Sequence, residues 1–276
     1  MASHSSSQKN SAFQHQAKKR FGQNFLNNID IIERIVRNIA PTAKDNLVEI
    51  GPGQGAITGP LLSLCPKLNV IEIDKHLIPI LLAQFAKYDD FKIHQEDALK
   101  FDFAKLATEK PLRIVGNLPY NISTPIIFRL LSFQNKIADM HFMLQKEVVE
   151  RIASTAGEKN YGRLSVMVQY YCQVENLFGV PPESFTPQPK VDSAIVRLTP
   201  FETLPFVAKD VTVFSKLVNV AFQQRRKTLR NSLKQLLPID QIDSLPVDTS
   251  LRPENITLEE YVNISNLIND SGEEND

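Results

Sequence analysis

RIVGNLPYNISTPIIFRLL, residues 113–131, is the stretch that decides the fold. Its apolar start predicts a buried strand over Leu112–Val115, and Ser123 or Thr124 is expected to cap the helix that follows. The tetrapeptide Asn117-Leu118-Pro119-Tyr120 therefore stands just beyond the carboxyl end of a strand. In open α/β sheets, ligands bind at that edge.

The chemistry of this tetrapeptide suits a planar ligand that carries an exocyclic amine. The side-chain oxygen of Asn117 and a carbonyl of the turn can accept the two N–H bonds of such an amine, and the ring of Tyr120 can stack on the plane of a base. None of the four residues is a nucleophile or a strong base. The alternative interpretation is a local turn with a packed tyrosine, because Asn and Pro favour turns for local reasons.

A glycine-rich turn lies upstream in a similar strand-turn-helix unit. LVEIGPGQGAI, residues 47–57, predicts a strand that runs into a turn where Gly51 and Gly53 let the backbone approach a ligand. The spacing is GxGxG, which disfavours the dinucleotide pattern GxGxxG. Glu72 ends the next predicted strand and suits ribose hydroxyls. Asp97 ends the strand after that, where it could accept from an adenine amine or merely cap a turn.

Strand and helix patterns alternate from about residue 40 to residue 200. Five β/α units followed by a pair of strands indicate an α/β fold with a doubly wound, mainly parallel sheet and an antiparallel edge. Beyond that point the pattern is helical only. We therefore expect a flexible arm over residues 1–17, a sheet domain over 18–200 and a small all-helical domain over 201–276.

The proline-rich loop PPESFTPQPKVDS, residues 181–193, joins the last two predicted strands. Its prolines hold Phe185 on a stiff support. An exposed Phe185 could be the second half of an aromatic sandwich with Tyr120. It could equally plug the apolar rim of the sheet.

Charge is neutral in total but segregated along the chain. The sequence has 31 basic and 31 acidic residues, yet residues 209–234 carry seven basic residues and one acidic residue. A helix break is expected near 223–226, because a continuous helix would place a basic residue on an apolar face. The freed basic side chains would face solvent or bind RNA phosphates. They are Arg225, Arg226, Lys227 and Arg230.

A second basic run opens the segment KKRFGQNFL, residues 18–26. Lys19 and Arg20 could contact phosphates in an arm that folds over a site. The alternative is a solvated charge run that precedes the next helix.

Cysteine, histidine and hydropathy patterns exclude several classes of protein. The two cysteines are far apart, no CxxC occurs and the histidines lack metal-ligand spacing, so we expect a reducing compartment and no metal. No apolar run approaches the roughly 18 residues that span a bilayer. The N-terminus lacks the hydrophobic segment of a signal peptide. We expect a cytoplasmic protein without a membrane partner.

Five motifs in this order resemble those of the ribosomal RNA adenine dimethyltransferases, over residues from about Gln14 to Leu267. They are KKRFGQNFL, EIGPGQG with its downstream carboxylates, NLPY, FTPQPKVDSA and QRRKTLRNSL. The likeness is to the bacterial small-subunit branch. It implies a class I, Rossmann-like methyltransferase domain that uses S-adenosylmethionine, followed by a small helical domain.

The resemblance also implies a reaction and a partner. Two methyl groups would be added to N6 of each of two adjacent adenosines in the 3′-terminal hairpin loop of 16S rRNA, within the assembling 30S subunit. We expect the enzyme to act as a monomer.

Site residues follow from the same resemblance. The residues implied to hold the cofactor are Asn24, Leu26, Gly51, Gly53, Glu72, Asp97, Ala98 and Asn117. The side-chain oxygen of Asn117 and the carbonyl of Leu118 would accept from the target amine, and Tyr120 and Phe185 would stack on the flipped base.

Three other interpretations remain open. A large-subunit dimethylase of the macrolide-resistance type has the same fold and cofactor. A non-catalytic RNA-binding assembly factor or transcription factor could also use this fold. A nicotinamide dehydrogenase is disfavoured by the glycine spacing and by the lack of an obvious proton donor at the sheet edge.

Overall fold

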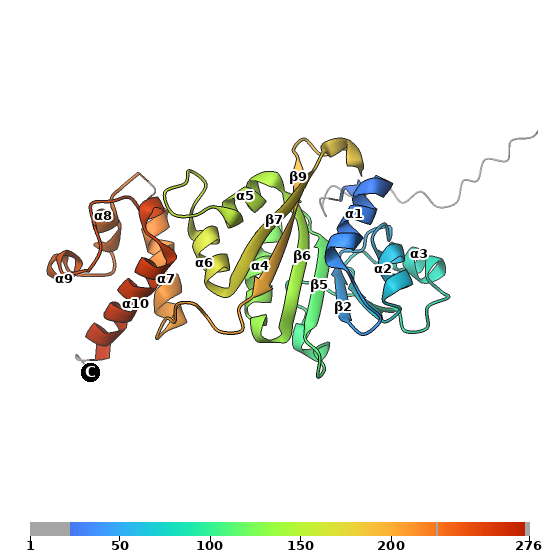
Figure 1. Cartoon of the computed structure of the whole chain (residues 1–276), viewed down its shortest axis with the longest axis horizontal. Coiled ribbons are helices and arrows are strands. Elements are labelled where there is room, and N and C mark those ends of the chain that lie inside the picture. The colour runs from blue at the N-terminus through green and yellow to red at the C-terminus, as the bar shows by residue number, and fades with distance from the viewer. Residues whose placement is uncertain (1–22, 225, 274–276) are drawn as a thin grey trace, which may run out of the picture.

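The computed structural model describes residues 23–224 and 226–273. Figure 1 shows a sheet with helices on both faces in one half of an elongated molecule and helices alone in the other. Three of the predicted phosphate contacts, Lys19, Arg20 and Arg225, lie outside the described residues.

The central sheet has seven strands in the order β4-β3-β2-β5-β6-β9-β7. The first five are parallel, and β9 pairs antiparallel with both β6 and β7. The predicted mainly parallel sheet with an antiparallel edge is confirmed. The strands are β2 (Asn46–Ile50), β3 (Leu68–Ile71), β4 (Lys92–His94), β5 (Leu112–Asn117), β6 (Ile137–Gln145), β7 (Cys172–Val180) and β9 (Ser193–Pro200).

Two layers of helices cover this sheet, and a separate apolar cluster lies under each layer. The layer over one face comprises α1 (Ile29–Ile39), α2 (Thr58–Leu64) and α3 (Ile78–Gln84). The layer over the other face comprises α4 (Ser123–Leu131), α5 (Lys146–Ala153) and α6 (Arg163–Tyr171). Short 3-10 turns span Phe103–Lys105, Gln134–Lys136, Pro182–Ser184 and Pro253–Asn255.

The predicted limits around the central stretch were wrong by a few residues. β5 does not stop at Val115 but continues through Gly116 to Asn117, because Gly116 pairs with both β2 and β6. A Cβ at Gly116 would lie 2.7 Å from the Ile50 carbonyl oxygen, so glycine permits this tight pairing. Helix α4 begins at Ser123, whose hydroxyl donates to the Tyr120 carbonyl, 3.2 Å away.

The N-terminal segment and the proline-rich loop form a second, two-stranded sheet. β1 (Phe25–Leu26) pairs antiparallel with β8 (Phe185–Thr186). The Asn27 amide also donates to the Ser184 carbonyl at 2.9 Å, and its side chain donates to the Thr186 hydroxyl at 2.7 Å. We call residues 23–28 the N-terminal strap, because the loop holds them along the ends of the parallel strands.

The described part of the C-terminal region is helical, as predicted. It contains α7 (Val211–Gln223), α8 (Leu229–Leu233), α9 (Ile239–Asp243) and α10 (Leu258–Glu273). The predicted break after Gln223 is confirmed. The apolar cluster of these helices includes Val166, Met167 and Tyr170 of α6, so α6 belongs to two cores. The domain boundary at residue 200 remains a prediction.

Candidate functional site

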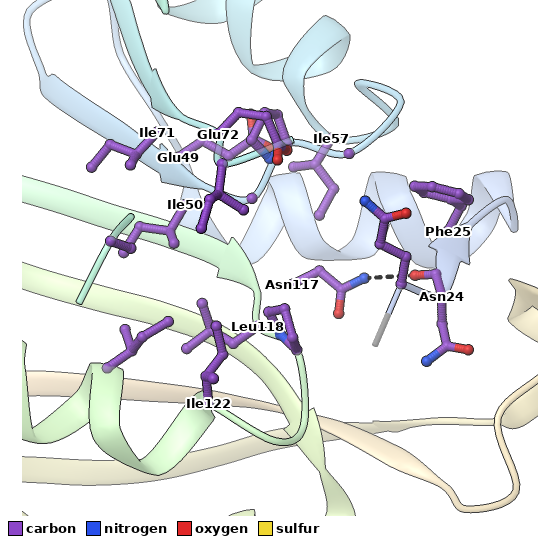
Figure 2. A pocket seen from close by; sticks show the side chains of 18 of the residues that line it. Asn24, Phe25, Glu49, Ile50, Ile57, Ile71, Glu72, Asn117, Leu118 and Ile122 are labelled. Atoms are coloured by element: carbon purple, nitrogen blue, oxygen red, sulfur yellow. Dashed lines mark hydrogen bonds between the residues drawn. The ribbon is translucent and has the colours of Figure 1, made fainter. Parts of the chain in front are cut away.

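A cavity of about 230 Å³ lies at the carboxyl ends of β2, β3, β4 and β5 (Figure 2). Its walls come from these strand ends, the NLPY turn and the N-terminal strap. The structure brings ten of the predicted site residues to this cavity. They are Asn24, Leu26, Gly51, Gly53, Glu72, Asp97, Ala98, Asn117, Leu118 and Tyr120.

The glycine turn leads from β2 into α2 beneath the cavity. Gly51, Gly53 and Gly55 all have positive φ, a region that side chains with a Cβ resist. At Gly55, a Cβ would also lie 2.7 Å from the Phe85 ring. The backbone can therefore turn within one short loop and present Gly51 and Gly53 to the cavity.

Asn117 stands at the end of β5 with its amide fixed by the strap. Its Nδ2 donates to the Asn24 carbonyl, 3.1 Å away (Figure 2). The amide therefore directs its oxygen away from this bond. No described residue donates to this oxygen or to the carbonyl of Leu118, whose own amide is anchored on the Met143 carbonyl at 3.2 Å. Neither acceptor therefore has a donor among the described residues; Asn117 is half-buried at the cavity and Leu118 is fully buried beside it.

Tyr120 is half-buried at the mouth of the cavity. Its hydroxyl is 2.7 Å from the hydroxyl of Ser193, at the start of β9, and burial raises the pKa of the phenol. This hydrogen bond fixes the hydroxyl end of the side chain, so the NLPY turn and the start of β9 together set the position of the ring.

Phe185 does not form the exposed half of an aromatic sandwich. It is 4% exposed, pairs with Leu26 across the β1–β8 ladder and packs in the apolar cluster under α1. It is not among the described residues that line the cavity. Of the two interpretations of Phe185, the structure favours the plug, because the strap covers the loop.

Four carboxylates line the cavity, and none of the described lining residues is Lys, Arg or His. Glu49, Glu72, Glu96 and Asp97 therefore give it a negative potential. Burial raises the pKa of Glu72, and a backbone bond from Asp74 at 2.7 Å opposes this rise. Such a cavity favours a cationic ligand and repels the pyrophosphate of a dinucleotide.

Glu49 was missed in the sequence because it lies inside the predicted strand rather than at its end. It is 2% exposed, and its side chain faces the same cavity as Glu72 (Figure 2). Burial, and then the charge of Glu72, raises the pKa of Glu49 to about 7 against the bond from Thr58. An acidic residue within an otherwise apolar strand is the sequence feature that could have identified Glu49 as a site residue.

Asp97 and Ala98 follow β4 at the far wall. Oδ1 of Asp97 accepts from the Leu99 amide at 3.0 Å, so the side chain does cap the turn. Its second oxygen takes no part in that bond, and the residue lines the cavity. Asp97 can therefore cap the turn and still accept a hydrogen bond from an adenine amine. Ala98 adds an apolar contact surface.

The predicted basic segment lies in the helical part of the molecule. Arg226 and Lys227 are exposed between α7 and α8. Arg230 instead forms two bonds to Asp243, of 2.8 and 2.7 Å. The structure thus weakens the expectation that Arg230 contacts phosphate, because its guanidinium already has an acidic partner.

Residues 23–224 and 226–273 contain no group of three or more His, Cys, Asp or Glu side chains arranged to hold a metal ion. Among these same residues, none of the helices combines the length and apolarity needed to cross a bilayer.

Comparisons with known proteins agree with this geometry. The ribosomal RNA adenine dimethylase family model matches residues 14–270. A relative from Saccharophagus degradans, ribosomal RNA small subunit methyltransferase A, is 66% identical over 92% of this chain and 95% of its own length.

Two solved structures are also similar. A dimethyladenosine transferase from Plasmodium falciparum has a TM-score of 0.76 and 27% identity, covering 90% of this chain and 98% of its own. The 23S rRNA methyltransferase ErmE has a TM-score of 0.68 and 23% identity, covering 89% of this chain and 100% of its own, and shows the fold alone. With the family model matching nearly the whole chain, the protein belongs to the ribosomal RNA adenine dimethylase family.

Proposed function

We propose that this enzyme transfers methyl groups from S-adenosylmethionine to N6 of two adjacent adenosines in the 3′-terminal hairpin loop of 16S rRNA. The observation that carries the proposal is the pair of free acceptors, Asn117 Oδ1 and the Leu118 carbonyl, beside a cavity without cationic side chains among its described lining residues. The 66% identical relative is named for the small subunit, which favours 16S over 23S rRNA.

The cavity residues fit the proposed cofactor. Glu72 presents a carboxylate to ribose hydroxyls, Asp97 and Ala98 border the region proposed for adenine, and the glycine turn leaves space for the methionine part. The four carboxylates suit a ligand that carries positive charge. When bound, S-adenosylmethionine supplies a methyl group already activated by its sulfonium.

Asn117 and Leu118 act on the target amine. The lone pair of adenine N6 is delocalised into the ring, which makes the amine a poor nucleophile. Two acceptors can draw its two N–H bonds towards tetrahedral geometry and so localise the lone pair. Holding the reactants in line is worth about 7 to 11 kcal/mol in well-oriented systems.

No described residue lining the cavity is His, Lys or Cys, and we assign its carboxylates to the cofactor, so we propose that the N6 proton leaves to water. Asn117 and Leu118 remain acceptors throughout and take no proton. Positioning rather than general base catalysis would then carry the reaction.

Tyr120 is proposed to stack on the extruded base, and its ring is already oriented by Ser193. Stacking on an aromatic ring is worth about 1 to 3 kcal/mol per base, which offsets the cost of extrusion. A stacking role for Phe185 remains a proposal that requires the loop around β8 to move, since the ring is buried.

The proposed setting is the cytoplasm, where the enzyme would act as a metal-free monomer on rRNA of the assembling 30S subunit. Arg226 and Lys227 would contact the rRNA backbone, with Lys19, Arg20 and Arg225 as further proposed contacts. Arg230 would join them only after separation from Asp243.

Methyl transfer from labelled S-adenosylmethionine to unmethylated small subunits tests the proposal. Wild type should yield dimethyladenosine in the 3′-terminal hairpin, and Asn117→Ala should lower the rate by at least about 100-fold, because one acceptor and the strap bond are lost. Asn135→Ala, an exposed asparagine outside the cavity, is the matched control and should remain active.

Subunit binding without methyl transfer by the wild type would contradict the enzymatic function. It would favour the non-catalytic assembly factor and make NLPY a structural turn. Product located in 23S rRNA would instead favour the large-subunit alternative.

A further inference from the structure

Glu49 is a buried carboxylate that lines the cavity without an individual role in the proposed reaction. It lies in β2 with its neighbour Glu72 at the end of β3, and both side chains line the cavity. A charged carboxylate in such a place needs a hydrogen-bond donor or a cation. The groups around it show which of these the protein supplies.

The groups that face Glu49 from neighbouring elements are acidic or neutral. Glu72 lies beside it, Glu96 and Asp97 follow β4, and the strap and β5 contribute the amides of Asn24 and Asn117. No cation lies among the described residues of this cavity wall. Thus none of the described lining residues offers Glu49 an opposite charge.

Thr58 supplies the hydrogen-bond donor. It is the first residue of α2, is fully buried and donates from Oγ1 to Glu49 Oε2 over 2.7 Å. No described residue donates to the other oxygen, Oε1. Hydrogen bonds to ionised groups are roughly twice as strong as neutral ones, so this bond favours the carboxylate form and fixes its orientation.

We propose that Thr58 is a positioning residue for cofactor binding, which orients the Glu49 carboxylate and favours its ionised form, so that the carboxylate can receive a cationic group of the cofactor. The inference rests on the proposed function in one respect, namely that the cation belongs to S-adenosylmethionine. S-adenosylmethionine carries two cationic groups, the sulfonium and the methionine ammonium, and of these the ammonium can donate hydrogen bonds to a carboxylate beside the glycine turn.

The sign of the pH dependence follows from this arrangement. The cofactor cation binds the ionised form of Glu49, so affinity rises as pH increases through the pKa of Glu49, about 7 in the free protein. Loss of the Thr58 hydroxyl raises that pKa and moves the rise to higher pH. Binding below the pKa also releases a proton.

The experiment is calorimetric titration of S-adenosylmethionine into the full chain from about pH 5.5 to about pH 8.5. Thr58→Val, which keeps the side-chain shape, should weaken binding about tenfold at pH 7, with a smaller difference at the alkaline end. Thr58→Ser should bind like wild type. Titration of the ligand's own groups is common to all variants and cancels in the comparison.

Three further variants make the result decisive. Thr203→Val, at an exposed site, controls for the substitution, and Glu49→Gln should abolish the pH dependence that Thr58→Val shifts. Thr58→Ala replaces Thr58→Val if circular dichroism shows that the valine variant is unfolded. An unchanged pH midpoint in the hydroxyl-free variant, or equal weakening at every pH, would overturn the role of Thr58. Absence of binding by wild type would overturn the proposed function instead.

Discussion

Asn117 has an amide with two different ends, and the strap binds one of them. The Nδ2 bond to the Asn24 carbonyl leaves the oxygen for a ligand, so a backbone group remote in sequence sets the chemical direction of the side chain. The sequence could predict an amide acceptor at the end of a strand. It could not predict the donor's partner, because that contact depends on where the strap folds.

Two substitutions of Tyr120 distinguish the contribution of its aromatic ring from that of its hydroxyl. Tyr120→Ala should lower the catalytic efficiency on rRNA about 5- to 150-fold, because stacking worth about 1 to 3 kcal/mol is lost. Tyr120→Phe keeps the ring and should lose little. Steady-state kinetics on small subunits measures both, with cofactor affinity measured separately; an equal loss in both variants would exclude stacking as the main role.

Glu49 and Phe185 show the limits of prediction from single residues. Alternation along a strand does not reveal that an acidic residue faces a cavity and meets the hydroxyl of Thr58. For Phe185, stiff prolines indicated a fixed position correctly in principle, but exposure depended on β1, which covers the ring. The cover on Phe185 comes from a segment distant in sequence, whereas the Glu49 contact is nine residues away and depends on the shape of the turn between β2 and α2.

At the scale of elements, the turn between β2 and α2 depends on glycine for two separable reasons. Gly55 has a φ of +83° and faces the Phe85 ring, whereas Gly157 has a φ of +90° and open space, with no heavy atom within 4 Å of the point that a Cβ would occupy. Gly157→Ala should cost about 1 to 2 kcal/mol of unfolding free energy. Gly55→Ala should cost about 2 to 5 kcal/mol, because crowding adds about 1 to 3 kcal/mol.

Chemical denaturation of both variants measures this difference. Gly157→Ala serves as the control for backbone conformation alone. Equal destabilisation would show that the Phe85 ring moves aside at no cost and that the turn tolerates a side chain there.

Most helices and strands were predictable from the local sequence pattern, but the residues at which they begin and end were not. Helix α1 begins after Asn28, whose side chain accepts from the Ile31 amide at 3.2 Å, and its buried residues Ile35, Val36 and Ile39 recur at helical spacing in the sequence. β5, in contrast, runs through Gly116 because β2 and β6 offer hydrogen-bond partners on both sides. Pairing partners are a property of the sheet rather than of the segment.

For the whole molecule, the exposed cations between α7 and α8 provide a test of rRNA docking. Arg226→Glu with Lys227→Glu should weaken small-subunit binding and flatten its dependence on salt, since each lost phosphate contact reduces the slope by roughly 0.7 to 0.9. Arg230→Gln should mainly affect stability, because it breaks the pair with Asp243. Binding measured across a salt series distinguishes the two, and an unchanged slope in the double variant would exclude this docking surface.

Helix α6 has one face in the core of the sheet and another in the core of the C-terminal helices, so the two halves seen in Figure 1 are joined through a shared rigid element. Packing therefore fixes the distance between the cavity at the sheet edge and the exposed Arg226 and Lys227. An RNA that contacts both sites would have to match this fixed distance. A hairpin separated from the rest of the rRNA would then reach the cavity without reaching the exposed cations between α7 and α8.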